Sequence, residues 1–351
     1  MISYLTILFV AWWLSAKVEK LRITNAKAAK NYKRVLITVL TCFIGFRFNV
    51  GADYFAYIYD YGKFLEKSYS ETLFSSDFAF KLMAKFGSLV YDSPTTMFFC
   101  AAFLFVLLFI NTLYKYSEHF SLSVVLFILC GTYLESCNAI RQSMAMAIIF
   151  SGYACIRERT LGKYILLVLL AMAFHSSAIV MLPLFFILSC PAKLNKLLWP
   201  IGIALSILVS YSGLFNFAEM ITGKAINLEE VAYFTTSVNI LRVAVAVAPC
   251  ILVPFLKKGQ YEKLALPINL IILNAVLMCV TSQSAYLARV AMYSNAFLCL
   301  ALPKLLYNLR VTKESITGIK SSMLVCYAIF WIYGIFNSAG LYPYQTIFTS
   351  H

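Results

Sequence analysis

Long apolar runs such as Leu264–Val280 recur along the whole chain, and they restrict its fold more than any other feature. Because lipid offers the backbone no hydrogen-bond partner, a segment that crosses a bilayer is either a helix or a strand of a closed barrel. These runs lack the alternation of barrel strands. Hydrophobic residues make up 62% of the 351 residues and charged residues only 13%, which is not typical of a soluble domain. The sequence predicts an all-α polytopic integral membrane protein.

The distribution of positive charge predicts how the chain is oriented. The formal net charge is +14, and the basic residues cluster in short connectors between apolar runs, most densely between Lys17 and Arg34. The positive-inside rule places that connector in the cytoplasm. We therefore expect Ile2–Ala16 to be a retained first helix with its N-terminus outside, and we expect no nucleic-acid partner.

The order of runs and connectors predicts a single membrane domain over residues 1–351, with about eleven or twelve crossings. Residues 49–95 are too polar to span, so they form the largest outer, or periplasmic, loop. A second outer loop is expected at 213–238. Within the first loop, aromatic residues recur at helical spacing and predict an amphipathic helix at the membrane interface. These residues are Tyr54, Tyr57, Tyr61 and Phe64.

The apolar segment 163–189 can be read as one span or as two. As one helix it would be about 40 Å long, against a hydrocarbon core of about 30 Å. A turn at His175 would instead return the later Lys257–Lys263 connector to the cytoplasm, although each half is shorter than a normal span. We favour two short helices that meet at His175.

Cysteine and histidine usage indicates neither a metal site nor a set of disulfides, and we expect no cofactor. The ten cysteines fall mostly inside apolar runs, they form no CxxC pair, and the chain has only three histidines. This pattern is typical of cysteines that pack in a helical core.

Charged residues at the outer ends of the runs are the candidates for function, because charge is costly in a bilayer and normally faces a cavity or a partner. The candidates share one expected depth: Arg47, Asp53, Glu135, Arg141, His175, Arg289 and the segment Tyr342–Tyr344. Each has a structural alternative. An arginine at a helix end can snorkel to the headgroups, Arg141 can pair with Glu135, His175 can cap a helix, and Asp53 can be the N-cap of the helix that follows it.

Four motifs in order resemble the EpsG family, whose members are similar to Wzy-type polymerases of bacterial surface polysaccharides. They are Arg47 with Gly51-Ala-Asp-Tyr54 and Tyr57, Asn138-Ala-Ile-Arg-Gln142, Leu170-Ala-Met-Ala-Phe-His-Ser-Ser-Ala178, and Ala288-Arg289 with Tyr293. The resemblance runs from about residue 35 to Tyr344. It implies a GT-C-like helical bundle in the bacterial plasma (inner) membrane, with an active site that faces the periplasm.

The resemblance also implies a metal-independent glycosyltransferase. It would transfer a growing glycan from undecaprenyl diphosphate to a sugar hydroxyl of the next lipid-linked repeat unit, as in O-antigen or other lipopolysaccharide and exopolysaccharide synthesis. Its partners would be that lipid-linked oligosaccharide, membrane lipids and, as a candidate, a chain-length co-polymerase.

The expected roles divide between arginines, a base and aromatic residues. Permanent, planar guanidinium groups suit diphosphate oxygens, so Arg47, Arg141 and Arg289 would stabilise the leaving group. His175, or alternatively Glu135 or Asp53, would activate the acceptor hydroxyl. The remaining substrate-binding candidates are Tyr54, Tyr57, Tyr293 and Tyr344, which could stack on sugar rings, and Gln142 beside Arg141.

Three other functions stay open from the sequence. A flippase of lipid-linked oligosaccharide would also use outer arginines, but it needs polar residues along a through-path, and the inner halves of the runs have almost no charge. A sugar O-acyltransferase would use a histidine but needs an inner polar cluster for its acyl donor. An O-antigen ligase differs only in its acceptor.

Overall fold

The computed structural model describes residues 1–349 except 192–237, 258, 283, 285–286 and 339, and most of these residues are helical. Within these residues the β-structure is limited to isolated bridges between Arg47 and Thr346 and between Leu256 and Leu309. The chain forms two compact units, one of Met1–Phe185 with Ser321–His351 and one of Phe186–Lys320.

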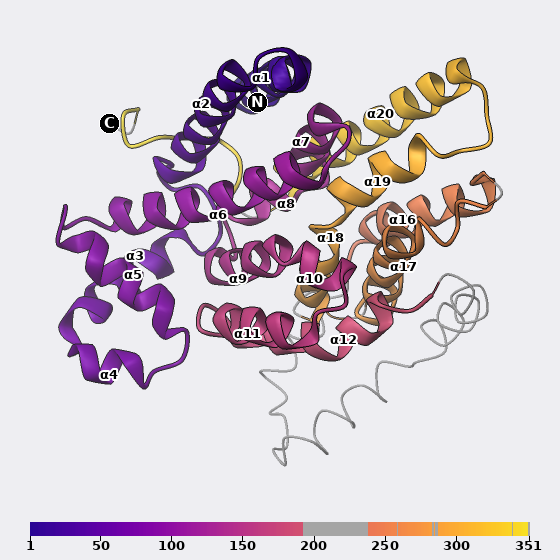
Figure 1. The fold of residues 1–351 in the computed structure, drawn as a ribbon. Helices are drawn as coiled ribbons and strands as arrows, with labels where there is room; N and C mark the ends of the chain where they lie inside the picture. Colours follow the sequence, from indigo (N-terminus) through magenta and orange to yellow (C-terminus); the bar gives the residue numbers. More distant parts are fainter. Residues whose placement is uncertain (192–237, 258, 283, 285–286, 339, 350–351) are drawn as a thin grey trace. The chain divides into compact units, whose positions relative to one another are not determined.

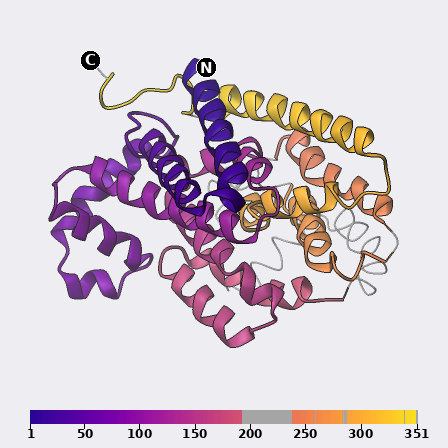
Figure 2. The ribbon, with the colours of Figure 1, turned by 45° about the horizontal axis from the view of Figure 1, so that its top comes forward.

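The first unit begins with two long helices that lie side by side (Figures 1 and 2). They are α1 (Ile2–Thr24) and α2 (Ala26–Gly45). The chain reverses at Asn25, whose side chain accepts the amide of Ala28 at 3.0 Å and so caps α2. The second half of α20 (Lys313–Asn337) also belongs to this unit, and its Trp331 ring packs edge-on against Tyr4 of α1.

The segment 49–95 folds into three short helices: α3 (Tyr54–Glu66), α4 (Tyr69–Leu73) and α5 (Phe78–Ser88). Helix α3 lies where the amphipathic helix is predicted, and its four aromatic residues are all buried, while its place at the membrane interface stays a prediction. They pack on protein: Tyr57 lies against Phe80 of α5, and Tyr54 stacks on Phe98 of the next helix.

Three helices of the first unit lie in successive layers in Figure 1: α6 (Pro94–Tyr116), α9 (Ile140–Ser151) and α11 (Leu161–Met172). Ser93 and Pro94 start α6, since the serine side chain accepts an amide of the first turn and proline suits that turn. Short helices join the layers: α7 (Phe120–Leu129), α8 (Thr132–Glu135) and α10 (Tyr153–Arg157).

The predicted break at His175 is confirmed. Helix α11 ends at Met172, and the chain resumes as a 3-10 turn, η1 (Ser176–Val180), followed by α12 (Met181–Leu188). Tyr164, near the start of α11, donates to the carbonyl of Met181 at 3.2 Å, and its ring lies 4.9 Å from that of Phe185. The segment therefore doubles back on itself as two short helices.

The second unit contains α16 (Ile240–Val247), η2 (Ala248–Phe255), α17 (Ala265–Val280), η3 (Leu287–Val290), α18 (Ala291–Asn295) and α19 (Leu298–Leu306). A buried amide holds part of it together, because the side chain of Asn269 in α17 donates to the carbonyls of Leu188 and Cys190, each at 3.0 Å.

Helix length and apolar composition together identify a polytopic membrane protein. Within the described residues, α1, α6 and α20 are long and apolar enough to cross a membrane, and five shorter apolar helical segments accompany them. The fold class is thus the predicted all-α membrane type, with most apolar runs split into shorter helices. The apolar run 197–211, which the sequence predicts to be a further span, and nearly all of the predicted loop 213–238 lie outside the described residues.

The C-terminal segment 340–349 is bound to the loop that follows α2. Phe48 donates its amide to the carbonyl of Gln345 at 3.0 Å, and Gly51 donates to that of Gly340 at 2.6 Å. On the other side of the loop, the amide of Ala52 donates to the side-chain oxygen of Asn138 at 2.7 Å. The loop after α2 is therefore fixed between the α8–α9 connector and the C-terminal segment.

Gly51 is a position at which this arrangement requires glycine. Its φ is +105°, and a Cβ there would lie 2.3 Å from the carbonyl oxygen of Cys137.

We expect Gly51→Ala to lower the free energy of unfolding by about 2 kcal/mol or more, from strain and a backbone clash. Gly62→Ala is the matched control, because Gly62 lies in α3 with nothing within 4 Å of a built Cβ. Thermal unfolding in detergent measures the stability of both variants. Equal melting temperatures for Gly51→Ala and Gly62→Ala would contradict the requirement for glycine at position 51.

Candidate functional site

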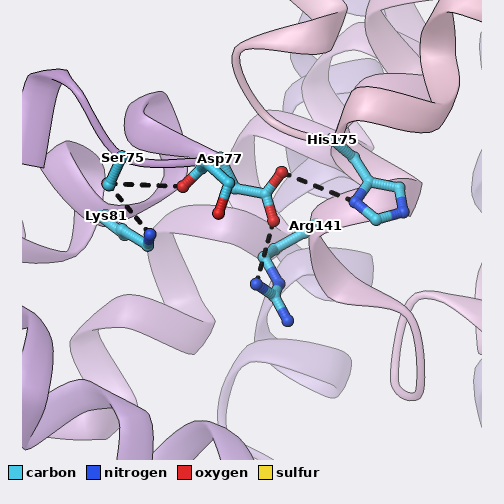
Figure 3. Close-up of polar contacts among 6 residues, drawn as sticks. Ser75, Asp77, Lys81, Arg141 and His175 are labelled. Atoms are coloured by element: carbon cyan, nitrogen blue, oxygen red, sulfur yellow. Dashed lines mark hydrogen bonds and ion pairs between the residues drawn. The ribbon is translucent and has the colours of Figure 1, made fainter. Parts of the chain in front are cut away.

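Asp77 joins two other charged side chains in the first unit (Figure 3). It precedes α5 in the left-handed conformation, with φ of 54°, which aspartate tolerates better than most residues. Its side chain is only 8% exposed. One carboxylate oxygen accepts from Arg141 Nη1 at 3.0 Å, and the other lies 3.7 Å from His175 Nδ1. Three separate segments of the chain thus meet at one carboxylate.

Arg141 enters the site from the first turn of α9. The side chain is 32% exposed, so part of the guanidinium group remains accessible. Its guanidinium carbon lies 5.6 Å from the ring centre of Tyr57, a cation–π contact. Arg141 forms its salt bridge with Asp77 and not with Glu135, which was the alternative from the sequence.

His175 enters from the break between α11 and η1. The backbone there is extended and His175 occupies the N-cap position of η1, but its side chain makes no capping hydrogen bond. The amide of Ala79 donates to the carbonyl of Ala173 at 2.9 Å, which fixes the start of α5 against the residues before His175. The imidazole is 31% exposed and turns Nδ1 toward Asp77.

The charges around Asp77 favour its ionised form. Burial opposes ionisation, but the contacts with His175 and then the charge of Arg141 outweigh it, so the pKa of Asp77 lies below its usual value. Lys81, one turn into α5, adds positive charge and donates to Ser75 Oγ at 3.0 Å (Figure 3). The site therefore holds one carboxylate beside two cationic groups, Arg141 and Lys81, and an imidazole.

The other acidic candidates lie near helix ends. Asp53 occupies the N-cap position of α3, as its structural alternative predicts, although its side chain makes no capping hydrogen bond. Glu135 is half-buried at the end of α8, and its backbone carbonyl accepts the amides of Asn138 and Ala139.

Arg47 is buried, with 2% of its surface exposed. Its Nε donates to the carbonyl of Val50 at 3.0 Å and its Nη1 to that of Ile44 at 2.5 Å, at the C-terminal end of α2. The guanidinium also lies over the ring of Phe98 at 4.6 Å. These contacts hold the loop after α2. Because they bury the guanidinium and occupy two of its donors, they do not favour a direct contact between Arg47 and a diphosphate.

Four of the substrate-binding candidates of the first unit are packing residues. Tyr54, Tyr57 and Gln142 are at most 5% exposed. Tyr344 stacks on Phe43 with ring centres 4.2 Å apart and donates to the Phe43 carbonyl at 2.5 Å. Tyr57 contributes to the site through Arg141, whose guanidinium lies over its ring and interacts with its phenol by hydrogen bonding and charge.

The candidates of the second unit lie together in sequence around η3 and α18. Arg289 is half-buried in η3, and Tyr293 is fully buried in α18. Among the residues that the structure describes, no three His, Cys, Asp or Glu side chains form a group that could hold a metal ion.

Sequence reasoning missed Asp77, the residue that unites the site. The signal was present in Ser75-Ser-Asp77, an aspartate directly before the amphipathic run Phe78–Ser88, which is a typical N-terminal helix boundary. Its partners, Arg141 and His175, lie 64 and 98 residues further along the chain. No local sequence pattern can identify partners at that separation.

The lowered pKa of Asp77 predicts an acid-sensitive contribution to stability. Because the folded-state pKa lies below the unfolded value of about 3.9, the contribution is present above that pH and is lost as the pH falls through the folded-state pKa. We expect Asp77→Asn to lower the free energy of unfolding at pH 7 by about 1–2 kcal/mol, since both partners are partly exposed.

Thermal unfolding measured from neutral pH to about pH 3 checks this prediction. The difference in the free energy of unfolding between wild type and Asp77→Asn should shrink as the pH falls. Protonation of Asp77 in the wild type removes the same charge as the substitution does. Asp53→Asn is the matched control, as that side chain makes no capping bond. A difference between wild type and Asp77→Asn that stays constant over the whole range would contradict the account.

Comparison with known proteins supports the resemblance that the motifs suggest. The EpsG family model matches residues 30–346, which is nearly the whole chain. Neither the curated proteins nor the solved structures gave a match. The matched range includes Asp77, Arg141, His175 and Arg289. The chain therefore belongs to the EpsG family and is a polysaccharide polymerase-type membrane protein.

Proposed function

We propose that the chain polymerises lipid diphosphate-linked oligosaccharide repeat units at the outer face of the plasma membrane. Family membership supports the polymerase type, and the positive-inside pattern supports the outer placement of the site. The observation that carries the proposal is the meeting of Asp77, Arg141 and His175 with the last two still about one-third exposed. A buried carboxylate orients two groups that a substrate can reach.

The proposed step is a glycosyl transfer. An oxygen of the acceptor sugar forms a bond to the anomeric carbon of the donor glycan, and the bond from that carbon to the diphosphate breaks. The acceptor proton passes to a base, and the lipid diphosphate leaves with the electron pair of the broken bond. Negative charge therefore develops on the diphosphate, and a proton must be accepted on the other side.

His175 is the base that the geometry favours. Its Nδ1 faces the carboxylate of Asp77, and a carboxylate at that position favours the tautomer with the proton on Nδ1. The second ring nitrogen, Nε2, then carries the lone pair and can accept the proton of the acceptor. After transfer, the charge of Asp77 stabilises the imidazolium, so Asp77 is a positioning residue for His175.

Arg141 is the first-unit arginine best placed for the diphosphate. It is partly exposed, and the pairing of Nη1 with Asp77 leaves further guanidinium donors for phosphate oxygens. Arg289 lies in the second unit and stays a predicted diphosphate-binding residue. Arg47 is buried on backbone carbonyls, so its proposed role is to hold the loop after α2. A metal ion is not required where arginines balance the developing charge.

Reconstitution tests the function directly. We expect purified protein in nanodiscs, supplied with the lipid-linked repeat unit of its own cell and neither metal nor nucleotide, to form a ladder of longer glycans with release of lipid diphosphate. Arg289→Ala should abolish the ladder while protein abundance stays normal. Movement of the substrate across the bilayer without any ladder would indicate a flippase instead. Transfer of glycan only to a different acceptor would indicate a ligase.

Single variants identify the base. We expect His175→Gln to slow polymerisation by about 100-fold or more, because general base catalysis contributes about that much. Glu135→Gln and Asp53→Asn are matched controls that should keep most of the wild-type rate. The initial rate of glycan extension, at equal protein abundance, is the measurement. A larger loss in either control than in His175→Gln would assign the base to that acid.

A further inference from the structure

A small internal cavity lies beside Arg47 in the first unit. Residues of α2, α6 and α9 and of the connector before α9 line it. Only a single water-sized occupant fits in its enclosed part. Most of the lining is apolar, including Phe98, Phe105 and Ile140, while Arg47, Ser136 and Ser143 are polar.

Two buried donors that line this cavity have no acceptor in the described part of the chain. Arg47 is 2% exposed and Ser143 is 1% exposed. Arg47 Nη2 and Ser143 Oγ are buried atoms without a hydrogen-bond partner among the residues that the structure describes. The third polar side chain, Ser136, donates to the carbonyl of Tyr133 at 2.6 Å. A guanidinium and a hydroxyl therefore offer hydrogen bonds to the same enclosed space.

The charge of Arg47 determines which occupant suits that space. Buried charges in proteins are normally paired, yet the salt bridges within the described residues include none to Arg47. Carbonyl oxygens accept two of its donors, and they provide only partial negative charge. An acceptor with a full negative charge would complete the pairing. A phosphate group is too large for a water-sized space, and among fully charged acceptors the monoatomic anions are nearest to that size.

We propose that this cavity is a binding site for a halide-sized anion, with chloride as the physiological class. Arg47 Nη2 and Ser143 Oγ donate to the ion, and the ring of Phe98 covers the guanidinium. The ion neutralises Arg47 and thereby connects the loop after α2 to α9. The site contains neither Asp77 nor His175, so the proposal does not depend on the proposed function.

Thermal unfolding in detergent tests the proposal without an activity assay. We expect the melting temperature of the wild type to rise by several degrees, and to saturate, as sodium chloride replaces sodium gluconate at constant ionic strength. Ser143→Ala should raise the half-saturating chloride concentration by about 10-fold, because it removes a hydrogen bond to a charged group. Ser151→Ala is the matched control on the same helix, since its hydroxyl donates to the Ile148 carbonyl. The proposal would be overturned if chloride did not raise the melting temperature of the wild type. It would also be overturned if Ser143→Ala had the same half-saturating chloride concentration as the wild type.

Bromide provides the direct test of position. Crystals of the full chain grown in sodium bromide should show an anomalous peak within hydrogen-bond distance of Arg47 Nη2 and Ser143 Oγ. A solvent peak at that point without anomalous signal would identify a water molecule and would also overturn the proposal.

Discussion

A backbone amide that leaves a helix within or beside a lipid bilayer has to find its partner inside the protein, because lipid provides none. In this chain the non-helical segments satisfy one another. Gly51 bonds to Gly340, Ala52 to the side chain of Asn138, and Ala79 to Ala173. These contacts bring segments from distant parts of the sequence together in one unit. The same arrangement brings charged side chains together at Asp77, and the candidate site is a consequence of it.

The buried charges of the first unit follow two different patterns. Asp77 is buried but its partners are partly exposed, so its charge is held by groups that can also reach a substrate. Arg47 is buried among carbonyls and an aromatic ring and contacts an enclosed space. The first pattern suits catalysis, in which groups must be both oriented and accessible. The second suits structural support. Two arginines with the same chemistry thus have different proposed roles because their surroundings differ.

Much of the helical architecture could be predicted because local patterns carry it. Apolar runs predict helices, the spacing of Tyr54, Tyr57, Tyr61 and Phe64 predicts the buried face of α3, and charge parity predicts the break at His175. The site was only partly predictable. Arg141 and His175 were identified as charged groups near helix ends. Their shared partner depends on long-range packing, and the tyrosines proposed for sugar stacking instead fill contacts between helices.

The central claim is that the lipid diphosphate binds at Arg141 with the reacting sugar beside His175. A cryo-electron microscopy structure of the wild-type chain in nanodiscs, with a non-hydrolysable lipid diphosphate-linked oligosaccharide bound, tests it most directly. The account predicts phosphate oxygens within hydrogen-bond distance of the Arg141 guanidinium and a sugar hydroxyl next to His175 Nε2. Density for the diphosphate in a place where it contacts neither residue would contradict the account.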